Sequence, residues 1–127
     1  MNIILISHGE FAKSLLETAE MILGKIENAQ SVCLYPHEGS DDFKQKFELA
    51  LSHTSGKTVV LCDIMGGTPC NVAMHYLDRT SLYSGMNLPM VISLVSEGSC
   101  DELIETARQQ IYDVALQLRQ LQQEDDE

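Results

Sequence analysis

A histidine near the start of the chain and an aspartate far downstream form the pair with the clearest chemistry. His8 follows an apolar run, and Asp63 ends a second one and opens Asp-Ile-Met-Gly-Gly-Thr-Pro-Cys. A neutral imidazole keeps a lone pair on one ring nitrogen, which can attack phosphorus. A carboxylate that accepts the N–H of the other nitrogen fixes the tautomer and stabilises the imidazolium that forms. We therefore predict a nucleophilic His8 oriented by Asp63.

The aspartate is followed by three residues, Gly66, Gly67 and Thr68, that could hold the group that the histidine would carry. Gly66 and Gly67 allow the backbone to approach closely, and Thr68 adds a hydroxyl at a predicted helix start, which favours anions. These segments contain no lysine or arginine, and the chain has no G-x-x-x-x-G-K-[ST] motif. We expect a phosphoryl group carried briefly, with no nucleotide or other cofactor. The charge of Glu10 opposes this interpretation unless its side chain points away.

Length, charge and cysteine spacing limit the class of protein. The 127 residues suffice for a single domain, placed at 1–123 with an acidic tail at 124–127. The net charge of −11 repels phosphate backbones, so nucleic acid is not an expected partner. No segment has the pattern of a signal peptide or a bilayer span, and we expect a cytoplasmic protein. The cysteines form no C-x-x-C pair, so we expect reduced thiols and no metal site.

Strand and helix patterns alternate along the chain. Apolar, β-branched runs predict strands at 2–7, 31–35, 57–63 and 81–84. Helical spacing and capping residues predict helices at 10–23, from 40 onward, from 68 to about 78, at 88–95 and from 101 onward. We therefore predict an α/β fold, an open and mostly parallel sheet of four parallel strands with helices on both faces.

The predicted topology brings the reactive residues together. In open α/β sheets, ligands bind beyond the carboxyl ends of the strands. His8, the segment 63–68 and the turn 85–87 each follow a predicted strand, so we expect them to meet at one edge. Beyond residue 110 the periodicity is ambiguous, because the apolar residues of 111–118 fit a helix and a strand equally well.

Three segments resemble, in order and spacing, the enzyme IIA component of the mannose-type bacterial sugar phosphotransferase system. They are Ile-Ser-His-Gly-Glu-Phe-Ala at 6–12, Asp-Ile-Met-Gly-Gly-Thr-Pro-Cys-Asn at 63–71 and Gly-Met-Asn-Leu-Pro-Met at 85–90. The resemblance covers nearly the whole chain. It implies that His8, with Asp63 as its partner, accepts a phosphoryl group from the phosphocarrier protein HPr. It also implies transfer to a separate IIB component, which phosphorylates sugar during uptake through the membrane IIC and IID subunits.

The same resemblance carries further expectations about the site and the assembly. It places the loop Gly66-Gly67-Thr68 beside the histidine and implies that Gly9, Met86 and Asn87 border the site. It also implies a homodimer in which an antiparallel C-terminal strand is exchanged between subunits. Residues 112–118 would correspond to that fifth strand, and their alternative helical period leaves the exchange open here.

Three other functions compete with this interpretation. Ser-His-Gly-Glu resembles the Arg-His-Gly-Glu of histidine phosphatases, but Ser7 stands where those enzymes have a phosphate-binding arginine. The phosphocarrier subunit of the dihydroxyacetone kinase system is similar in fold and uses the same histidine chemistry. The Gly-Gly-Thr-Pro and Asn-Leu-Pro-Met segments favour the sugar-transport component. In the third alternative, the chain is a binding module in which His8 is incidental.

Overall fold

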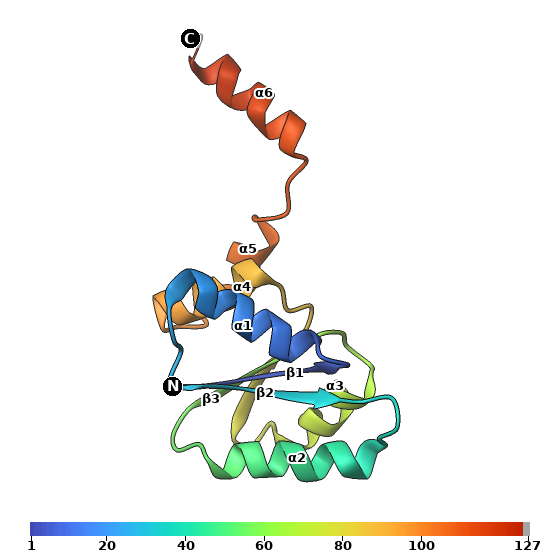
Figure 1. Cartoon of the computed structure of the whole chain (residues 1–127). Coiled ribbons are helices and arrows are strands. Elements are labelled where there is room, and N and C mark those ends of the chain that lie inside the picture. Colours follow the sequence, from blue (N-terminus) through green and yellow to red (C-terminus); the bar gives the residue numbers. More distant parts are fainter. Residues whose placement is uncertain (126–127) are drawn as a thin grey trace.

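The computed structural model describes residues 1–125 and contains one parallel sheet with helices on both faces (Figure 1). The strands are β1 (Asn2–His8), β2 (Ala29–Leu34), β3 (Thr58–Cys62) and β4 (Thr80–Tyr83), in the order β2-β1-β3-β4. The helices are α1 (Phe11–Leu23), α2 (Ser40–Ser52), α3 (Thr68–Ala73), α4 (Leu88–Glu97), α5 (Leu103–Arg108) and α6 (Val114–Asp125), with a 3₁₀ turn, η1 (Met74–Tyr76). The predicted α/β class and the four parallel strands are confirmed.

The sheet separates two hydrophobic layers. Helices α1, α4 and α5 cover one face, and α2 and α3 cover the other (Figure 1). In β1, Ile3 and Leu5 pack into the first layer, and Ile4 and Ile6 pack into the second. Because both faces are covered, β1 reads as an uninterrupted apolar run rather than as an alternating one.

Several predicted helix details are corrected. The third helix ends at Ala73 and continues only as the 3₁₀ turn, well before the predicted end near residue 78. The second and third helices are preceded by Gly39 and Gly67, so Ser40 and Thr68 are first helical residues rather than caps. Glycine at that position lets the chain enter each helix without a capping side chain.

The buried side of α1 agrees only in part with the one that the sequence pattern predicts. Ala12, Leu15, Leu16 and Ala19 are buried, whereas Phe11 and Ile22 are exposed. The helical spacing of Phe11, Leu15, Ala19 and Ile22 predicts these four on the buried side; Leu15 and Ala19 are buried, and Phe11 and Ile22, near the two ends of the helix, are not. A single sequence fixes the period of an amphipathic helix more firmly than the direction of its apolar side.

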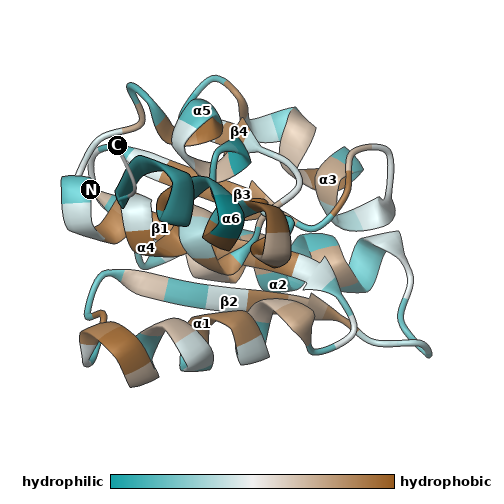
Figure 2. Ribbon diagram, turned by 90° about the horizontal axis from the view of Figure 1, so that it is seen from above, coloured by the Kyte–Doolittle hydropathy of each residue, from teal (hydrophilic) through white to brown (hydrophobic). Residues whose placement is uncertain are grey.

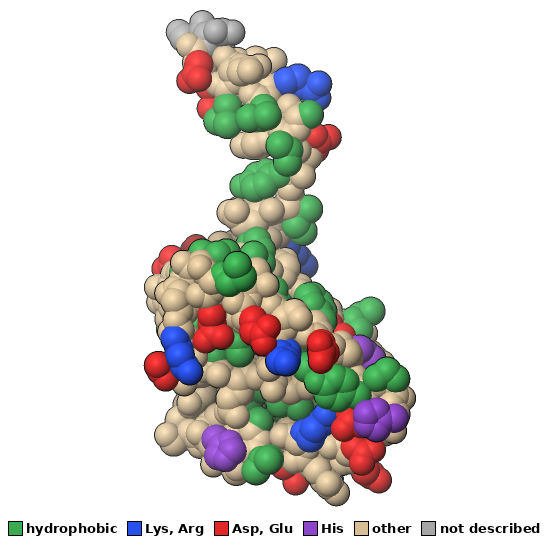
Figure 3. Space-filling model, viewed as in Figure 1, with side chains coloured by type: hydrophobic (Ala, Val, Ile, Leu, Met, Phe, Trp, Pro, Cys, Tyr) green, Lys and Arg blue, Asp and Glu red, His purple; other side chains and the backbone are tan. Residues whose placement is uncertain are grey.

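The C-terminal segment forms α6, a helix that projects away from the sheet (Figure 1). None of its residues is buried, and hydrophobic side chains lie exposed along the projecting segment (Figure 3). Its beginning is hydrophobic and its end hydrophilic (Figure 2). A helix pairs its own backbone groups, whereas a lone strand would leave them unpaired. The fifth strand is therefore absent from residues 1–125 of this single chain, and the homodimer stays a prediction.

The boundary between the predicted domain and its acidic tail lies within α6. Glu124 and Asp125 belong to that helix, and 126–127 lie outside the described residues. Within residues 1–125, no helix has the length and apolar character needed to cross a bilayer. All four cysteines are free thiols.

Candidate phosphoryl-transfer site

The site lies where β1 and β3 end. The two strands are parallel neighbours, with Ile6 opposite Cys62, so the residues that follow these positions emerge side by side. His8 is the last residue of β1, and Asp63 comes directly after β3. His8 Nδ1 lies 2.8 Å from Asp63 Oδ2. The structure therefore brings together the two residues that the sequence analysis paired.

The Asp63 carboxylate accepts a hydrogen bond from β1 that a backbone carbonyl of β3 would accept if β3 were longer. The N–H of Asn2 donates to the Lys57 carbonyl at 2.8 Å, so the backbone N–H groups of the even-numbered residues of β1 point toward β3. The last of these donors is the N–H of His8. Because β3 ends at Cys62, this N–H donates to Asp63 Oδ2 instead, at 2.9 Å. One carboxylate oxygen thus holds both the backbone and the ring of the histidine.

The carboxylate is fixed and ionised. Its side chain is 12% exposed, and Oδ1 accepts the N–H of Ile64 at 2.9 Å. Burial acts to raise the pKa of Asp63, but hydrogen bonds from the His8 backbone, the His8 ring and the Ile64 N–H outweigh it and leave the pKa below its ordinary value. An ionised carboxylate can only accept, so the neutral imidazole carries its proton on Nδ1. Nε2 keeps its lone pair.

Gly67 lies against the edge of the imidazole. A Cβ atom at this position would be 2.5 Å from His8 Cε1 and 3.1 Å from His8 Nε2. Any side chain here would push against the ring, so the position requires glycine. Gly66 has a φ of +90°, which strains residues with a side chain, but a Cβ there would have no neighbour within 4 Å. The two glycines are therefore needed for different reasons.

The loop offers backbone donors beside the ring. Among residues 1–125, no acceptor is hydrogen-bonded to the N–H of Gly66 or Thr68. The helix that follows, α3, has only six residues, so the field of aligned peptide dipoles contributes little here. Any anion bound at this loop would depend mainly on individual N–H groups.

Replacing Gly67 by alanine should displace the imidazole without straining the backbone, because the φ of Gly67 is −88°. We expect the phosphoryl-transfer rate to fall about 10²-fold, the typical cost of misplacing a reacting group by about 1 Å. Gly56→Ala is the matched control, because Gly56 has a φ of +77°, has no neighbour within 4 Å of an added Cβ and precedes β3 at the end away from the site; it should lower the free energy of unfolding by about 1–2 kcal/mol while leaving the transfer rate nearly unchanged. Rapid-quench transfer and urea unfolding measure the two quantities. Equal transfer rates for the two variants would contradict the contact with His8.

The three residues expected to border the site form part of its frame. The Gly9 N–H donates to the Leu34 carbonyl at 2.7 Å, which ties the end of β1 to β2. Met86 is buried in the core, and its N–H donates to the Cys62 carbonyl at 3.0 Å. Asn87 Oδ1 accepts the N–H of Met90 at 2.8 Å and caps α4. Within the described part of the chain, none of the three is hydrogen-bonded to His8 or Asp63.

Ser7 is a positioning residue that the sequence analysis missed. Its side chain is fully buried, and its Oγ accepts the N–H of Ala12 at 2.7 Å and donates to the Gly9 carbonyl at 3.3 Å. The hydroxyl therefore joins the turn after His8 to the first turn of α1. A serine between a strand and a helix is a recognisable capping signal, but Ser7 was considered only as the replacement of an arginine.

Ser7→Ala should therefore lower the free energy of unfolding by about 1–2 kcal/mol, because a buried N–H loses its acceptor. Urea unfolding followed by circular dichroism measures the change. Ser14→Ala is a suitable control, since Ser14 is exposed on the same helix, and its effect should stay within about 0.5 kcal/mol. Equal effects of the two substitutions would show that the Ser7 hydroxyl does not hold the turn.

The surroundings of the pair are apolar rather than charged. Glu10 is exposed and makes no ion pair with residues 1–125. Over the same residues, the lysine ion pairs are Lys13–Glu17 and Lys46–Glu38, neither of which includes the site. Exposed hydrophobic side chains flank the histidine in sequence and the aspartate in its loop, namely Phe11, Ile64 and Met65.

Cys62 and Cys70 lie just before and after the site loop, and both are buried. Burial first, and then the neighbouring Cys70, raises the pKa of the Cys62 thiol to about 12. A thiol with so high a pKa is a poor nucleophile. The interpretation of these cysteines as small hydrophobic residues, made from the sequence, agrees with their burial.

A parallel α/β sheet with a histidine and an aspartate joined at its carboxyl edge suits a protein that carries a small anionic group on the imidazole. The family model EIIA-man, described as the PTS system fructose IIA component, matches residues 2–111. The chain belongs to this family, the IIA components of the mannose-type sugar phosphotransferase system. The family predicted from the three sequence segments is confirmed.

Individual relatives agree with the family match. The chain is 31% identical over 101 residues to the fructose-specific EIIA component of Bacillus subtilis, which covers 76% of this chain and 69% of the relative. It is 32% identical over 114 residues to the mannose-specific EIIAB component of Escherichia coli. This alignment covers 83% of this chain and 35% of the relative. The chain thus spans about a third of that longer protein.

A solved structure shows the same fold. The PTS IIA protein associated with the fucose utilization operon of Streptococcus pneumoniae superposes with a TM-score of 0.84 at 30% identity, covering 92% of this chain and 95% of that one. These similarities do not favour the histidine-phosphatase or dihydroxyacetone-kinase alternatives.

Proposed function

We propose that His8 carries a phosphoryl group between two protein partners of a sugar phosphotransferase system. The observation that supports this most directly is the bond from His8 Nδ1 to Asp63 Oδ2, which leaves Nε2 as the nucleophile on a half-exposed ring. The transfer exchanges one phosphorus–nitrogen bond for another. The bond to the donor histidine breaks as the bond to Nε2 forms, and the proton on Nδ1 stays in place beside the carboxylate.

The neighbouring groups support such a transfer. The ionised Asp63 compensates the positive charge that the ring gains when Nε2 bonds to phosphorus. The N–H groups of Gly66 and Thr68 are suited to the phosphoryl oxygens, and the narrow approach at Gly67 keeps the loop close to the ring. Neutral donors stabilise the group without the strong charge pairing that would slow its departure.

Family membership supports the choice of partners. The proposed donor is HPr, and the proposed acceptor is a separate IIB component that acts with the membrane IIC and IID subunits. We place the transfer in the cytoplasm and infer a homodimer as the working form. The names of the relatives mention fructose, mannose, sorbose and fucose, and no one sugar is assigned to this chain.

Phosphorylation in a reconstituted system tests the proposal. The protein is incubated with phosphoenolpyruvate, enzyme I and HPr, and its intact mass is measured. We expect one added phosphoryl group that is labile in acid and stable in base, and peptide mass spectrometry should locate it on His8. Omission of HPr should prevent the addition. Labelling directly from ATP, or a phosphate on His37, His53 or His75, would contradict the proposed role.

A further inference from the structure

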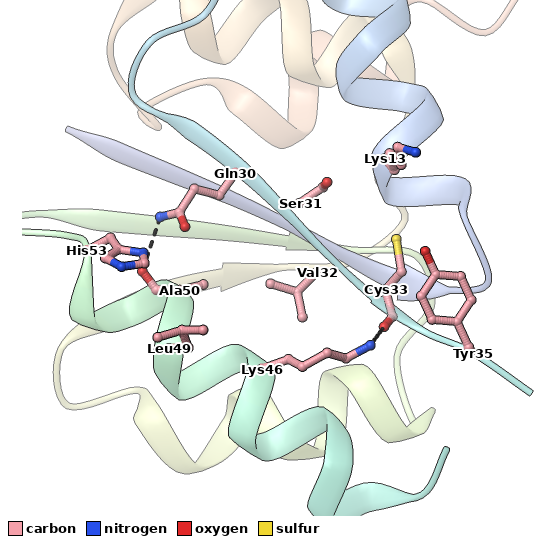
Figure 4. A pocket seen from close by; sticks show the side chains of 10 residues that line it. All are labelled: Lys13, Gln30, Ser31, Val32, Cys33, Tyr35, Lys46, Leu49, Ala50 and His53. Carbon is pink, nitrogen blue, oxygen red and sulfur yellow. Dashed lines mark hydrogen bonds between the residues drawn. The ribbon is translucent and has the colours of Figure 1, made fainter. Parts of the chain in front are cut away.

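The edge of the sheet formed by β2 contains an open groove whose lining includes neither His8 nor Asp63. Within residues 1–125, β2 pairs only with β1 and is therefore an edge strand. A groove of about 360 Å³ runs along it, and Figure 4 shows the side chains that line it, from β2, α1 and α2. Its lining includes four successive β2 residues, 30–33. Because successive residues point to opposite faces, the groove follows the strand edge itself and not one face of the sheet.

The backbone of β2 presents unpaired groups to this groove. The Ile3 N–H donates to the Asn28 carbonyl and the Gly9 N–H to the Leu34 carbonyl, so even-numbered positions of the β2 segment bond to β1. Ser31 and Cys33 therefore direct their backbone groups outward. Among residues 1–125, the N–H groups of Ser31 and Cys33 and the carbonyl of Ser31 have no hydrogen-bond partner.

The carboxyl end of this stretch is closed by side chains. Lys46 Nζ donates to the Cys33 carbonyl, and the N–H of Tyr35 donates to Glu38 Oε1 at 2.8 Å. At the amino end the Ala29 N–H donates to the Ile26 carbonyl at 3.3 Å, so the open part is short and has Ser31 at its centre. It offers the backbone pattern that an additional strand needs, which is two outward N–H groups with a carbonyl between them.

The charge of the groove contrasts with the charge of the chain. Its ionisable lining side chains include Lys13, Lys46 and His53 and no carboxylate, although the chain has a net charge of −11. The acidic partners of the two lysines, Glu17 and Glu38, do not line the groove. The Lys13–Glu17 pair is exposed and separated by 4.0 Å, so Lys13 can turn to another anion at little cost.

We propose that this groove binds an extended, acidic segment of a partner protein, which adds to β2 as a further strand. Backbone hydrogen bonds to Ser31 and Cys33 would hold the segment, and Lys13 and His53 would face its carboxylates. The opposite edge of the sheet is formed by β4, which is separate from this surface.

Nuclear magnetic resonance with a model peptide tests the proposal. The probe is Ac-Glu-Val-Glu-Val-Glu-Val-NH₂, titrated to millimolar concentration into ¹⁵N-labelled protein. We expect the largest shifts at the amides of Ser31 and Cys33, and smaller ones at Gln30 and Val32, whose N–H groups bond to β1. The lysine counterpart, Ac-Lys-Val-Lys-Val-Lys-Val-NH₂, should bind at least about threefold more weakly. Equal binding of the two peptides, or shifts centred elsewhere, would overturn the proposal.

Substitutions on the edge separate backbone pairing from charge. Ser31→Pro removes an N–H that has no partner within the described chain, so the sheet should fold as before and peptide affinity should fall about tenfold or more. Ser31→Ala keeps the N–H and should bind like the wild type. Lys13→Glu should weaken binding about threefold, and Lys25→Glu, an exposed residue outside the groove, should not.

Two further measurements keep the test decisive. If Ser31→Pro does not fold, a peptide N-methylated at alternate residues removes the same backbone bonds from the other side, and undiminished binding of that peptide would contradict strand addition. Amide exchange of the unbound protein checks the premise, since the Ser31 and Cys33 protons should exchange faster than those of Gln30 and Val32. Protection of Ser31 without peptide would show that the edge is already covered.

Discussion

His8→Ala should abolish phosphorylation of the protein by HPr while leaving its fold intact. The substitution removes the proposed nucleophile, the imidazole that Asp63 holds through Nδ1. Asp63 keeps two of its three hydrogen bonds in the variant, because the N–H groups of residue 8 and Ile64 belong to the backbone. The intact mass after incubation with phosphoenolpyruvate, enzyme I and HPr should show no added phosphate, and the thermal midpoint should change little.

His75→Ala is the matched control for this loss, because His75 is exposed on the 3₁₀ turn η1, away from the Asp63 carboxylate. It should accept one phosphoryl group at the rate of the wild type. A phosphorylated His8→Ala protein would remove the histidine from the mechanism, and a loss of phosphorylation in both variants would point to damage of the fold.

Asp63→Asn should slow phosphoryl transfer by up to about 10⁴-fold, the effect of exchanging the orienting carboxylate of a catalytic triad for an amide. An amide cannot accept hydrogen bonds both from the two His8 N–H groups and from the Ile64 N–H, because only one of its two terminal atoms is an acceptor. With Oδ1 toward His8, the NH₂ group faces the N–H of Ile64. With the NH₂ group toward His8, it opposes the backbone N–H and forces the ring proton onto Nε2, where the nucleophile should be.

Rapid-quench measurement of transfer from phosphorylated HPr gives the rate for this variant. Asp78→Asn serves as the control, since Asp78 is exposed and precedes β4 at the opposite end of the sheet. The control should transfer at the wild-type rate. An Asp63→Asn protein with an undiminished rate would show that the carboxylate supports the fold alone.

The same substitution should change the acid dependence of stability. The pKa of Asp63 in the folded protein lies below the ordinary value of 3.8, so its carboxylate stabilises the fold above that value. This contribution is lost as the pH falls through the folded-state pKa. Between about pH 5 and 2, the free energy of unfolding should therefore fall more steeply for the wild type than for Asp63→Asn. Parallel pH profiles for the two proteins would contradict the lowered pKa.

The fold could be predicted from the sequence because β1 and β3 have uninterrupted apolar runs. Such runs are typical of strands in a sheet that is covered by helices on both faces. The starts of the first four helices were also recovered to within a few residues, whereas the predicted end of the third helix near residue 78 was wrong. The face of α1 was recovered only in part, at Leu15 and Ala19. Phe11 and Ile22 share the helical period with the buried residues, and only the position of the sheet decides which stripe is covered.

The reactive pair was predictable because both residues directly follow strands whose carboxyl ends must meet. What the sequence could not provide was the reason for each glycine at 66 and 67, because that depends on a φ angle and on a contact with a ring 59 residues upstream. The role of Ser7 required the distance to the N–H of Ala12. The sequence also left open whether 111–118 is a helix or a strand. No residue of α6 is buried, so no buried face imposes a clear helical pattern on its apolar residues.

A single Asp63 oxygen that accepts both the backbone N–H and the ring N–H of His8 couples the main chain to the charge of the imidazole. A change in the electron density of the ring changes the strength of the ring hydrogen bond to that oxygen. The hydrogen bond from the His8 backbone N–H to the same oxygen changes with it, and so does the chemical shift of the His8 amide proton. The resonance of this one amide is thus an intrinsic spectroscopic reporter of the state of the ring. It requires no label beyond ¹⁵N and leaves the reactive nitrogen untouched.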